Sequence, residues 1–173
     1  DDGSIAANVE ALKIEPGYAS ARSNLGLSYL RRSDVDDAIR EYRAAVEIEP
    51  DQSANRRDLG DALLQKGDAD GATREYQEAV RLDPDDAHSN VQIGSTLIRR
   101  GKYADAIHAL KESIRVRPKY ALAHYNLGCA PAATGEIDAA IDAYEAALDI
   151  DPDYFEAHCN LANRLSDRGR TAD

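Results

Sequence analysis

Two cysteines and two of the four histidines are the side chains best suited to bind a metal ion in this sequence. Cys129 and Cys159, with His124 and His158, would supply sulfur and nitrogen ligands. None of them forms a Cys-x-x-Cys or His-x-x-x-His pair that would place two ligands on one face of a helix. We therefore expect no metal site. Two free thiols in a reducing compartment explain the cysteines, so we expect a cytoplasmic protein; no targeting signal is visible.

Carboxylates are plentiful, and they could act as general acids or bases. They gather at expected helix starts, as in Asp34, Asp36 and Asp37, where negative charge is favourable. No phosphate-binding loop and no nucleophile motif accompanies them. We expect no catalytic residue, no cofactor and no enzymatic activity of the chain itself.

A column of polar side chains recurs every 34 residues: Asn24, Asp58, Gln92, Asn126 and Asn160. An amide offers both a donor and an acceptor, so a ladder of amides can pair with the backbone of an extended peptide of almost any sequence. Asp58 interrupts the ladder and would need a donor-rich segment opposite it. The alternative is that these side chains cap or bridge neighbouring helices.

The same interval separates five prolines, Pro16, Pro50, Pro84, Pro118 and Pro152. A strict period of this length indicates units that bury their apolar faces only by stacking, which makes a solenoid. We expect the second helix of a truncated repeat at 1–18, full repeats at 19–52, 53–86, 87–120 and 121–154, and the first helix of a truncated repeat at 155–173. The chain opens without methionine, and we expect it to be a piece of a longer protein.

Both halves of each repeat have the pattern of helices. In the first full repeat an apolar stripe follows the i, i+3, i+4, i+7 rule: Val35, Ala38, Ile39, Tyr42, Ala45 and Val46. Glycine also recurs within the first helices, at Gly26, Gly60, Gly94 and Gly128. Because glycine costs roughly 1 kcal/mol in a helix relative to alanine, its repetition predicts a close helix contact. A second column, Ser33, Gly67, Gly101, Gly135 and Gly169, is predicted to form the turn that ends the first helix.

These residues resemble the tetratricopeptide repeat. The resemblance rests on the string Asn24-Leu25-Gly26-x-x-Tyr29, on Ala38, Tyr42 and Ala45, and on Pro50, and it covers nearly the whole chain. It implies an all-α fold, a right-handed α-solenoid of stacked antiparallel helix pairs. It also implies a concave groove, lined by the first helices, that holds peptides or partner helices. The sequence departs from the family where a large aromatic often stands, at Arg22, Arg56, Asn90, His124 and His158.

We expect the groove to be lined by first-helix residues that the apolar stripe does not use. The expected peptide-binding residues are Asn24, Leu27, Arg57, Asp58, Asp61, His88, Gln92, Ser95, Tyr125, Asn126 and Asn160. The amide ladder among them is similar to the asparagine ladder in the repeat region of O-linked N-acetylglucosamine transferase.

Composition and charge narrow the possible partners. Charged residues make up 31% of the chain, and no apolar run approaches the roughly 20 residues of a membrane span, so we expect no membrane partner. The net charge of −11 would repel phosphate, so we expect no nucleic acid. The charge is uneven, however, with +5 in residues 87–120 and −7 in residues 121–154. The basic repeat is either a docking patch for an acidic partner or an aid to correct stacking.

Pro131 stands inside a first helix, where proline costs about 3 kcal/mol and kinks the chain. We expect local irregularity there, either as a tolerated defect or as a bend that reshapes the groove.

Three functions remain open. The first is a protein-protein interaction scaffold that holds an extended peptide or helix of a partner in the groove. The second is the substrate-recruiting arm of a larger enzyme such as a glycosyltransferase. The third is self-association, with a homodimer formed through the unpaired helix at 3–14, whose apolar residues are Ile5, Val9, Leu12 and Ile14.

Overall fold

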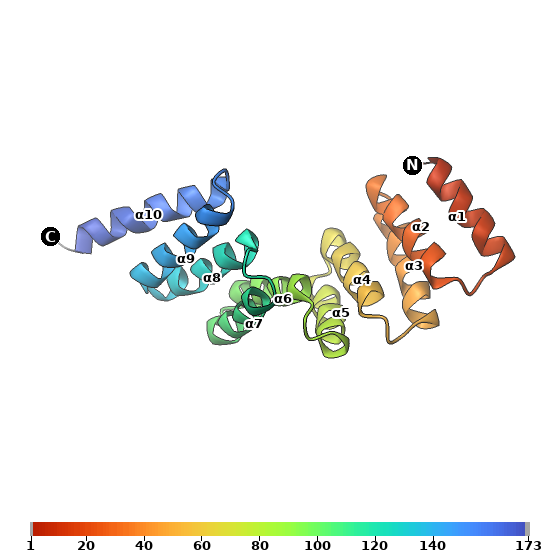
Figure 1. Ribbon diagram of the computed structural model, residues 1–173, viewed down its shortest axis with the longest axis horizontal. Helices are drawn as coiled ribbons and strands as arrows, with labels where there is room; N and C mark the ends of the chain where they lie inside the picture. Colours follow the sequence, from red (N-terminus) through yellow and green to blue (C-terminus); the bar gives the residue numbers. More distant parts are fainter. Residues whose placement is uncertain (1, 172–173) are drawn as a thin grey trace. The chain divides into compact units, whose positions relative to one another are not determined.

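The computed structural model describes residues 2–171, with side chains as far as Gly169 (Figure 1). These residues form ten α-helices and no β-strand. The helices are α1 Asp2–Ile14, α2 Ala19–Arg31, α3 Val35–Ile48, α4 Ser53–Lys66, α5 Ala69–Leu82, α6 Ala87–Arg99, α7 Tyr103–Val116, α8 Ala121–Thr134, α9 Ile137–Ile150 and α10 Phe155–Thr171. The expected all-α fold is confirmed.

The chain divides after Pro84 into an N-terminal unit and a C-terminal unit, each compact in itself. We call α2, α4, α6, α8 and α10 the A helices, and α1, α3, α5, α7 and α9 the B helices. In the N-terminal unit α2 packs against α3 and α4 against α5, while α3 joins the two pairs. In the C-terminal unit the pairs are α6 with α7 and α8 with α9, and α10 packs on α9 (Figure 1). Each unit is thus a stack of helical hairpins.

The glycines within the A helices lie against a large side chain of the paired B helix. A Cβ atom on Gly60 would meet the ring of Tyr76 at 2.7 Å, and one on Gly128 would meet Tyr144 at the same distance. Gly26 faces Tyr42 in the same way, and Gly94 faces Leu110. Tyr42, Tyr76, Tyr144 and Leu110 are at most 2% exposed. The predicted close contact is therefore confirmed, and it is the packing rule of the core.

The second glycine column ends the A helices through a left-handed backbone. Gly67, Gly101 and Gly135 have φ between 72° and 91°, and Ser33 adopts φ 65°. Gly169 was expected to form the same turn, and this prediction is wrong, because α10 continues through it to Thr171. Glycine permits a left-handed turn but also accepts helical angles, so its presence alone does not end a helix.

The residues that replace the family's aromatic tie each A helix to the turn before it. Arg22 Nη2 donates to the carbonyl of Pro16 at 3.3 Å, and Arg56 Nε donates to that of Pro50 at 3.2 Å. His124 and His158 use Nε2 to reach Pro118 and Pro152 at 2.9 and 2.8 Å. Asn90 donates instead to the carbonyl of Asp86, the residue just before α6. Four of these five side chains thus satisfy the carbonyl of the repeating proline, a role that the sequence did not indicate.

Pro131 does not break α8, although we expected local irregularity there. The helix is continuous from Ala121 to Thr134, with Pro131 buried inside it. The Pro131 carbonyl accepts the backbone N–H of Glu136 at 2.9 Å and the hydroxyl of Thr134 at 3.1 Å. The last turn of the helix is therefore well bonded.

Helix α1 packs against α2 and contains no fully buried residue. Ile5, Val9 and Leu12 are half-buried, whereas Ile14 is 87% exposed. Most of the apolar face that we assigned to dimer formation is thus partly covered within the chain, and the homodimer stays a prediction. No helix in the described part is long and apolar enough to cross a membrane.

Candidate functional site

The candidate site lies on the side of the A helices that carries the polar column, which we call the A face. In the N-terminal unit this face contains a hollow of about 220 Å³ between α2 and α4. It is lined by Ser23, Asn24, Leu27, Leu30, Tyr42, Asp58 and Asp61. The structure therefore brings together four of the predicted groove residues, namely Asn24, Leu27, Asp58 and Asp61.

The hollow is acidic on its α4 side. Asp61 Oδ1 accepts the hydroxyl of Tyr76 at 2.6 Å, and Asp58 Oδ1 lies 3.6 Å from Arg57 Nε. Burial and then the charges of Asp58 and Asp61 raise the pKa of Tyr42, whose side chain forms part of the wall. The tyrosine thus stays neutral beside two carboxylates, and the predicted site residue Arg57 pairs with Asp58.

The two A helices of this hollow are held together by a buried hydrogen bond. Ser23 Oγ on α2 donates to Asn55 Oδ1 on α4 at 2.7 Å. Asn55 is only 6% exposed, so the bond is shielded from water. It fixes the spacing of the helices that present Asn24 and Asp58.

In the C-terminal unit the A face carries a cluster of tyrosines. The ring centroid of Tyr125 lies 4.9 Å from that of Tyr154 and 5.8 Å from that of Tyr144, in tilted arrangements typical of favourable aromatic pairs. Asn160 Nδ2 on α10 donates to the hydroxyl of Tyr125 on α8 at 3.2 Å. The structure therefore joins two predicted groove residues, and Asn160 bridges neighbouring A helices.

Cys129 lies beside this cluster without the properties of a nucleophile. Burial raises the pKa of its thiol, and the hydroxyl of Tyr144 lies 3.7 Å from its sulfur. A thiol with a raised pKa stays protonated and unreactive at neutral pH. Cys129 and Cys159 are not joined to each other, and among the described residues no group of three His, Cys, Asp or Glu side chains could hold a metal ion.

The other predicted site residues lie along two A helices of the C-terminal unit. His88, Gln92 and Ser95 are half-buried on α6, and Asn126 is half-buried on α8. Within residues 2–171, the side chains of Gln92 and Asn126 make no hydrogen bond, and neither does that of the exposed Asn24. Three of the four amides in the column thus keep their donors and acceptors available.

Sequence reasoning missed two tyrosines of the A face. Tyr42 was assigned to the core, yet it also lines the hollow. Tyr154 stacks on Tyr125 from the turn before α10. A signal for Tyr154 was present, because Tyr18, Tyr120 and Tyr154 stand 34 residues or a multiple of that apart, just before an A helix.

Known structures share this fold. The crystal structure of MamA aligns with a TM-score of 0.79 at 24% identity, covering 90% of this chain and 91% of that one. A second MamA structure gives 0.78 at 27% identity, covering 87% and 82%. YrrB, described as a TPR protein with an unusual peptide-binding site, gives 0.75 at 24% identity, covering 88% and 79%. No curated protein sequence matches the chain at a significant level.

The sequence pattern of the tetratricopeptide repeat matches residues 5–54, 23–87 and 91–155. These ranges span most of the chain and both units, and they contain the glycine–tyrosine contacts and the boundary prolines described above. The chain belongs to the tetratricopeptide repeat family.

Proposed function

We propose that the chain is an interaction scaffold, and that the A face of each unit by itself can bind an extended segment of another protein. The observation that carries this proposal is the set of unpaired amides. Asn24, Gln92 and Asn126 occupy the same place in the first, third and fourth full repeats and make no side-chain hydrogen bond within the described residues. Each can donate to and accept from one peptide group of a bound backbone.

The two A faces favour different side chains of the bound segment. Asp58 and Asp61 line the α4 side of the hollow of the N-terminal unit, and Leu27, which also lines it, is 43% exposed. This combination suits a lysine or arginine next to an apolar residue. The tyrosines of the C-terminal unit suit an apolar or aromatic side chain, because Tyr125 and Tyr154 present ring surface at little cost in side-chain entropy.

Membership of the tetratricopeptide repeat family supports a scaffold, since the repeat builds binding surfaces rather than catalytic sites. The description of YrrB as a peptide-binding TPR protein supports a peptide ligand for the same fold. No enzyme family is indicated by these relatives.

The test is a pull-down from lysate in which the partner is identified by mass spectrometry and its binding segment is then synthesised. Its affinity is measured for the intact chain, for Asn24→Ala with Asn126→Ala, and for Gln77→Ala. Gln77 is the matched control, because it is an exposed amide on the B helix α5.

We expect the double variant to bind the segment about tenfold or more weakly, because the unit that holds the segment loses up to two backbone hydrogen bonds. We expect Gln77→Ala to bind as the unchanged chain does. Equal affinity of all three proteins, with helicity unchanged by circular dichroism, would show that the amides do not bind the partner.

A further inference from the structure

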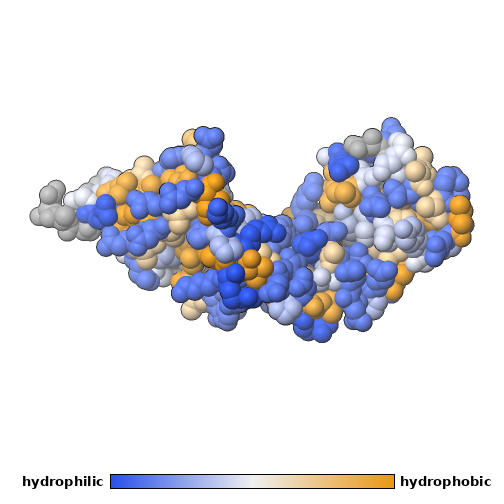
Figure 2. Space-filling model, in the orientation of Figure 1, coloured by the Kyte–Doolittle hydropathy of each residue, from blue (hydrophilic) through white to orange (hydrophobic). Residues whose placement is uncertain are grey.

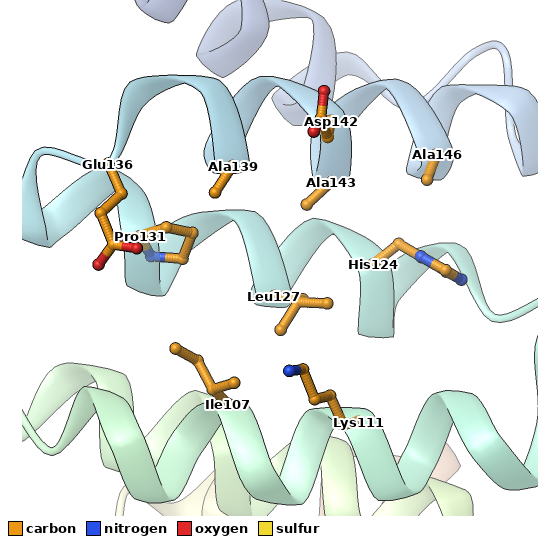
Figure 3. A pocket seen from close by; sticks show the side chains of 10 residues that line it. All are labelled: Ile107, Lys111, His124, Leu127, Pro131, Glu136, Ala139, Asp142, Ala143 and Ala146. Carbon is orange, nitrogen blue, oxygen red and sulfur yellow. The ribbon is translucent and has the colours of Figure 1, made fainter.

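The C-terminal unit has a second concave surface, formed by α7, α8 and α9. Its cavity volume is about 430 Å³, and Figure 3 shows the side chains that line it. Ile107 and Lys111 come from α7, Leu127 and Pro131 from α8, and three alanines from α9. We call this cavity the outer pocket.

The outer pocket does not belong to the A face. An α-helix turns by about 100° per residue, so His124, Leu127 and Pro131 share one side of α8. Tyr125 and Cys129 fall on the other side by the same rule. A ligand of the outer pocket would therefore not compete for the tyrosine cluster.

An ion pair that both full hairpins of the N-terminal unit carry is absent at the outer pocket. In hairpin α2–α3, Arg22 Nη1 donates to Glu41 Oε2 at 2.9 Å, and in α4–α5, Arg56 Nη1 donates to Glu75 Oε2 at 3.1 Å. Hairpin α8–α9 has His124 and Ala143 in these places. His124 turns to the carbonyl of Pro118, and the short side chain of Ala143 leaves the space open.

Two further alanines widen the opening. Ala139 and Ala146 line the pocket beside Ala143, and Figure 3 shows the α9 alanines above Leu127. Leu127 in turn points toward Ile107 and Lys111 of α7. Figure 2 also shows apolar surface over the part of the chain that carries α8 to α10. The floor of the pocket is thus apolar and accepts a bulky apolar side chain.

The two rims of the pocket carry opposite charges. Lys111 stands on the α7 side, and Glu136 and Asp142 stand on the α9 side. Lys111 and Asp142 form no ion pair within residues 2–171. The surrounding sequence has the same distribution of charge, since the net charge is +5 in residues 87–120 and −7 in residues 121–154. The rims therefore favour one orientation of a charged ligand.

We propose that the outer pocket docks a short segment of a partner protein that has one bulky apolar residue, with Asp or Glu on one side of it and Lys or Arg on the other. The apolar residue fills the space above Leu127. The acidic side faces Lys111, and the basic side faces Asp142 and Glu136. Opposite rims supply orientation through charge complementarity, whereas the apolar anchor supplies most of the affinity.

The test is a selection from a random-peptide phage library on the intact chain alone, after which the enriched peptides are compared on the intact chain and on the double variant His124→Arg, Ala143→Glu. This variant copies the ion pair of α2–α3 and α4–α5 into the pocket, so the repeat itself provides evidence that the fold tolerates it. Lys111→Glu is a second variant that reverses one rim at an exposed position. Enriched peptides are synthesised, and their affinities are measured by fluorescence anisotropy.

We expect the enriched peptides to carry the apolar residue flanked by opposite charges. Their affinity should fall about tenfold or more on the double variant and about threefold or more on Lys111→Glu, with greater weakening by salt than a neutral peptide shows. Asn126→Ala, on the A face, should leave their affinity unchanged. The proposal is overturned if both pocket variants bind the enriched peptides as tightly as the unchanged chain, or if Asn126→Ala alone weakens them.

Discussion

The N-terminal and C-terminal units have the same packing pattern in their cores and differ on their surfaces. In the first, Gly60 lies against Tyr76, and in the second Gly128 lies against Tyr144, at the same close distance. The boundary prolines accept a side-chain hydrogen bond from Arg22 and Arg56 in one unit and from His124 and His158 in the other. The repeat therefore dictates the interior and the turns.

The surfaces follow no such rule. The A face of the N-terminal unit has an acidic hollow beside Asp58 and Asp61, whereas that of the C-terminal unit has stacked tyrosines. The outer pocket of the C-terminal unit lies on the other side of the hairpins. At the equivalent positions the N-terminal unit has ion pairs, such as that of Arg22 with Glu41. The two units thus differ in the columns that do not repeat, and we propose that ligand specificity comes from these columns.

The largest expected effect tests whether the cores are equivalent. Tyr76→Ala and Tyr144→Ala should each lower the free energy of unfolding by about 3–5 kcal/mol, because each removes a fully buried ring. Hydrogen exchange should show the loss of protection within the mutated unit, since repeats are stabilised by their neighbours. Tyr18→Ala is the control, at a side chain that is 49% exposed. A cost below about 1 kcal/mol in one unit would contradict the common core.

Glycine substitutions also test whether the two cores are equivalent, and their expected effects on stability are smaller. Gly60→Ala and Gly128→Ala should each cost about 1–3 kcal/mol, because a Cβ atom 2.7 Å from a buried tyrosine ring outweighs the gain in helix propensity. Gly169→Ala should instead stabilise α10 by up to about 1 kcal/mol, since nothing lies within 4 Å of its Cβ position. Urea unfolding measures all three. Equal effects at the three positions would mean that propensity alone governs them.

Removal of one tyrosine hydroxyl should change stability differently in the two units. Tyr76→Phe should cost about 1.5 kcal/mol, because the hydroxyl donates to the carboxylate of Asp61 at 2.6 Å. Tyr144→Phe should change stability by less than about 0.5 kcal/mol, since its hydroxyl lies 3.7 Å from the weak acceptor Cys129 Sγ. A double-mutant cycle with Asp61→Asn isolates the first contact. Equal losses of stability in Tyr76→Phe and Tyr144→Phe would show that the two hydroxyl contacts do not differ in strength.

Alkaline pH tests the tyrosine cluster. Burial raises the pKa of Tyr154 to about 12, above the ordinary value of 10.0. The unfolded chain loses this proton first, so the stability that Tyr154 contributes is complete below about pH 10 and is lost as the pH rises toward 12. Absorbance of tyrosinate should show late steps, because burial also raises the pKa values of Tyr42, Tyr125 and Tyr144, and Tyr154→Phe should reduce the amplitude near pH 12 by one tyrosine. A step near pH 10 for Tyr154 would indicate that its hydroxyl is exposed to water.

The fold could be predicted from the residues that recur every 34 positions, because these residues form the core and the turns. The helix of Val35–Ile48, the contact of Gly26 with Tyr42 and the left-handed turn at Gly67 all follow from residues that recur every 34 positions. Gly169 was the exception, since a glycine also fits within a helix.

The candidate site was harder to predict because it depends on side chains that occur once. The structure groups Asn24 with Asp58 and Asp61, and Tyr125 with Asn160, which were all predicted. It adds Tyr154, which no expectation included. The outer pocket has Ala143 where the N-terminal hairpins have a glutamate, and an absent side chain leaves no motif in a sequence.

The most direct test of binding along the A face is photo-crosslinking of the partner segment. A benzoylphenylalanine is placed at Leu27 or Asn126 on the A faces, and at the exposed Arg74 on the B helix α5 as the control. We predict crosslinks to the bound segment from Leu27 or Asn126 and none from Arg74. Crosslinks from Arg74, with none from Leu27 or Asn126, would contradict the proposal.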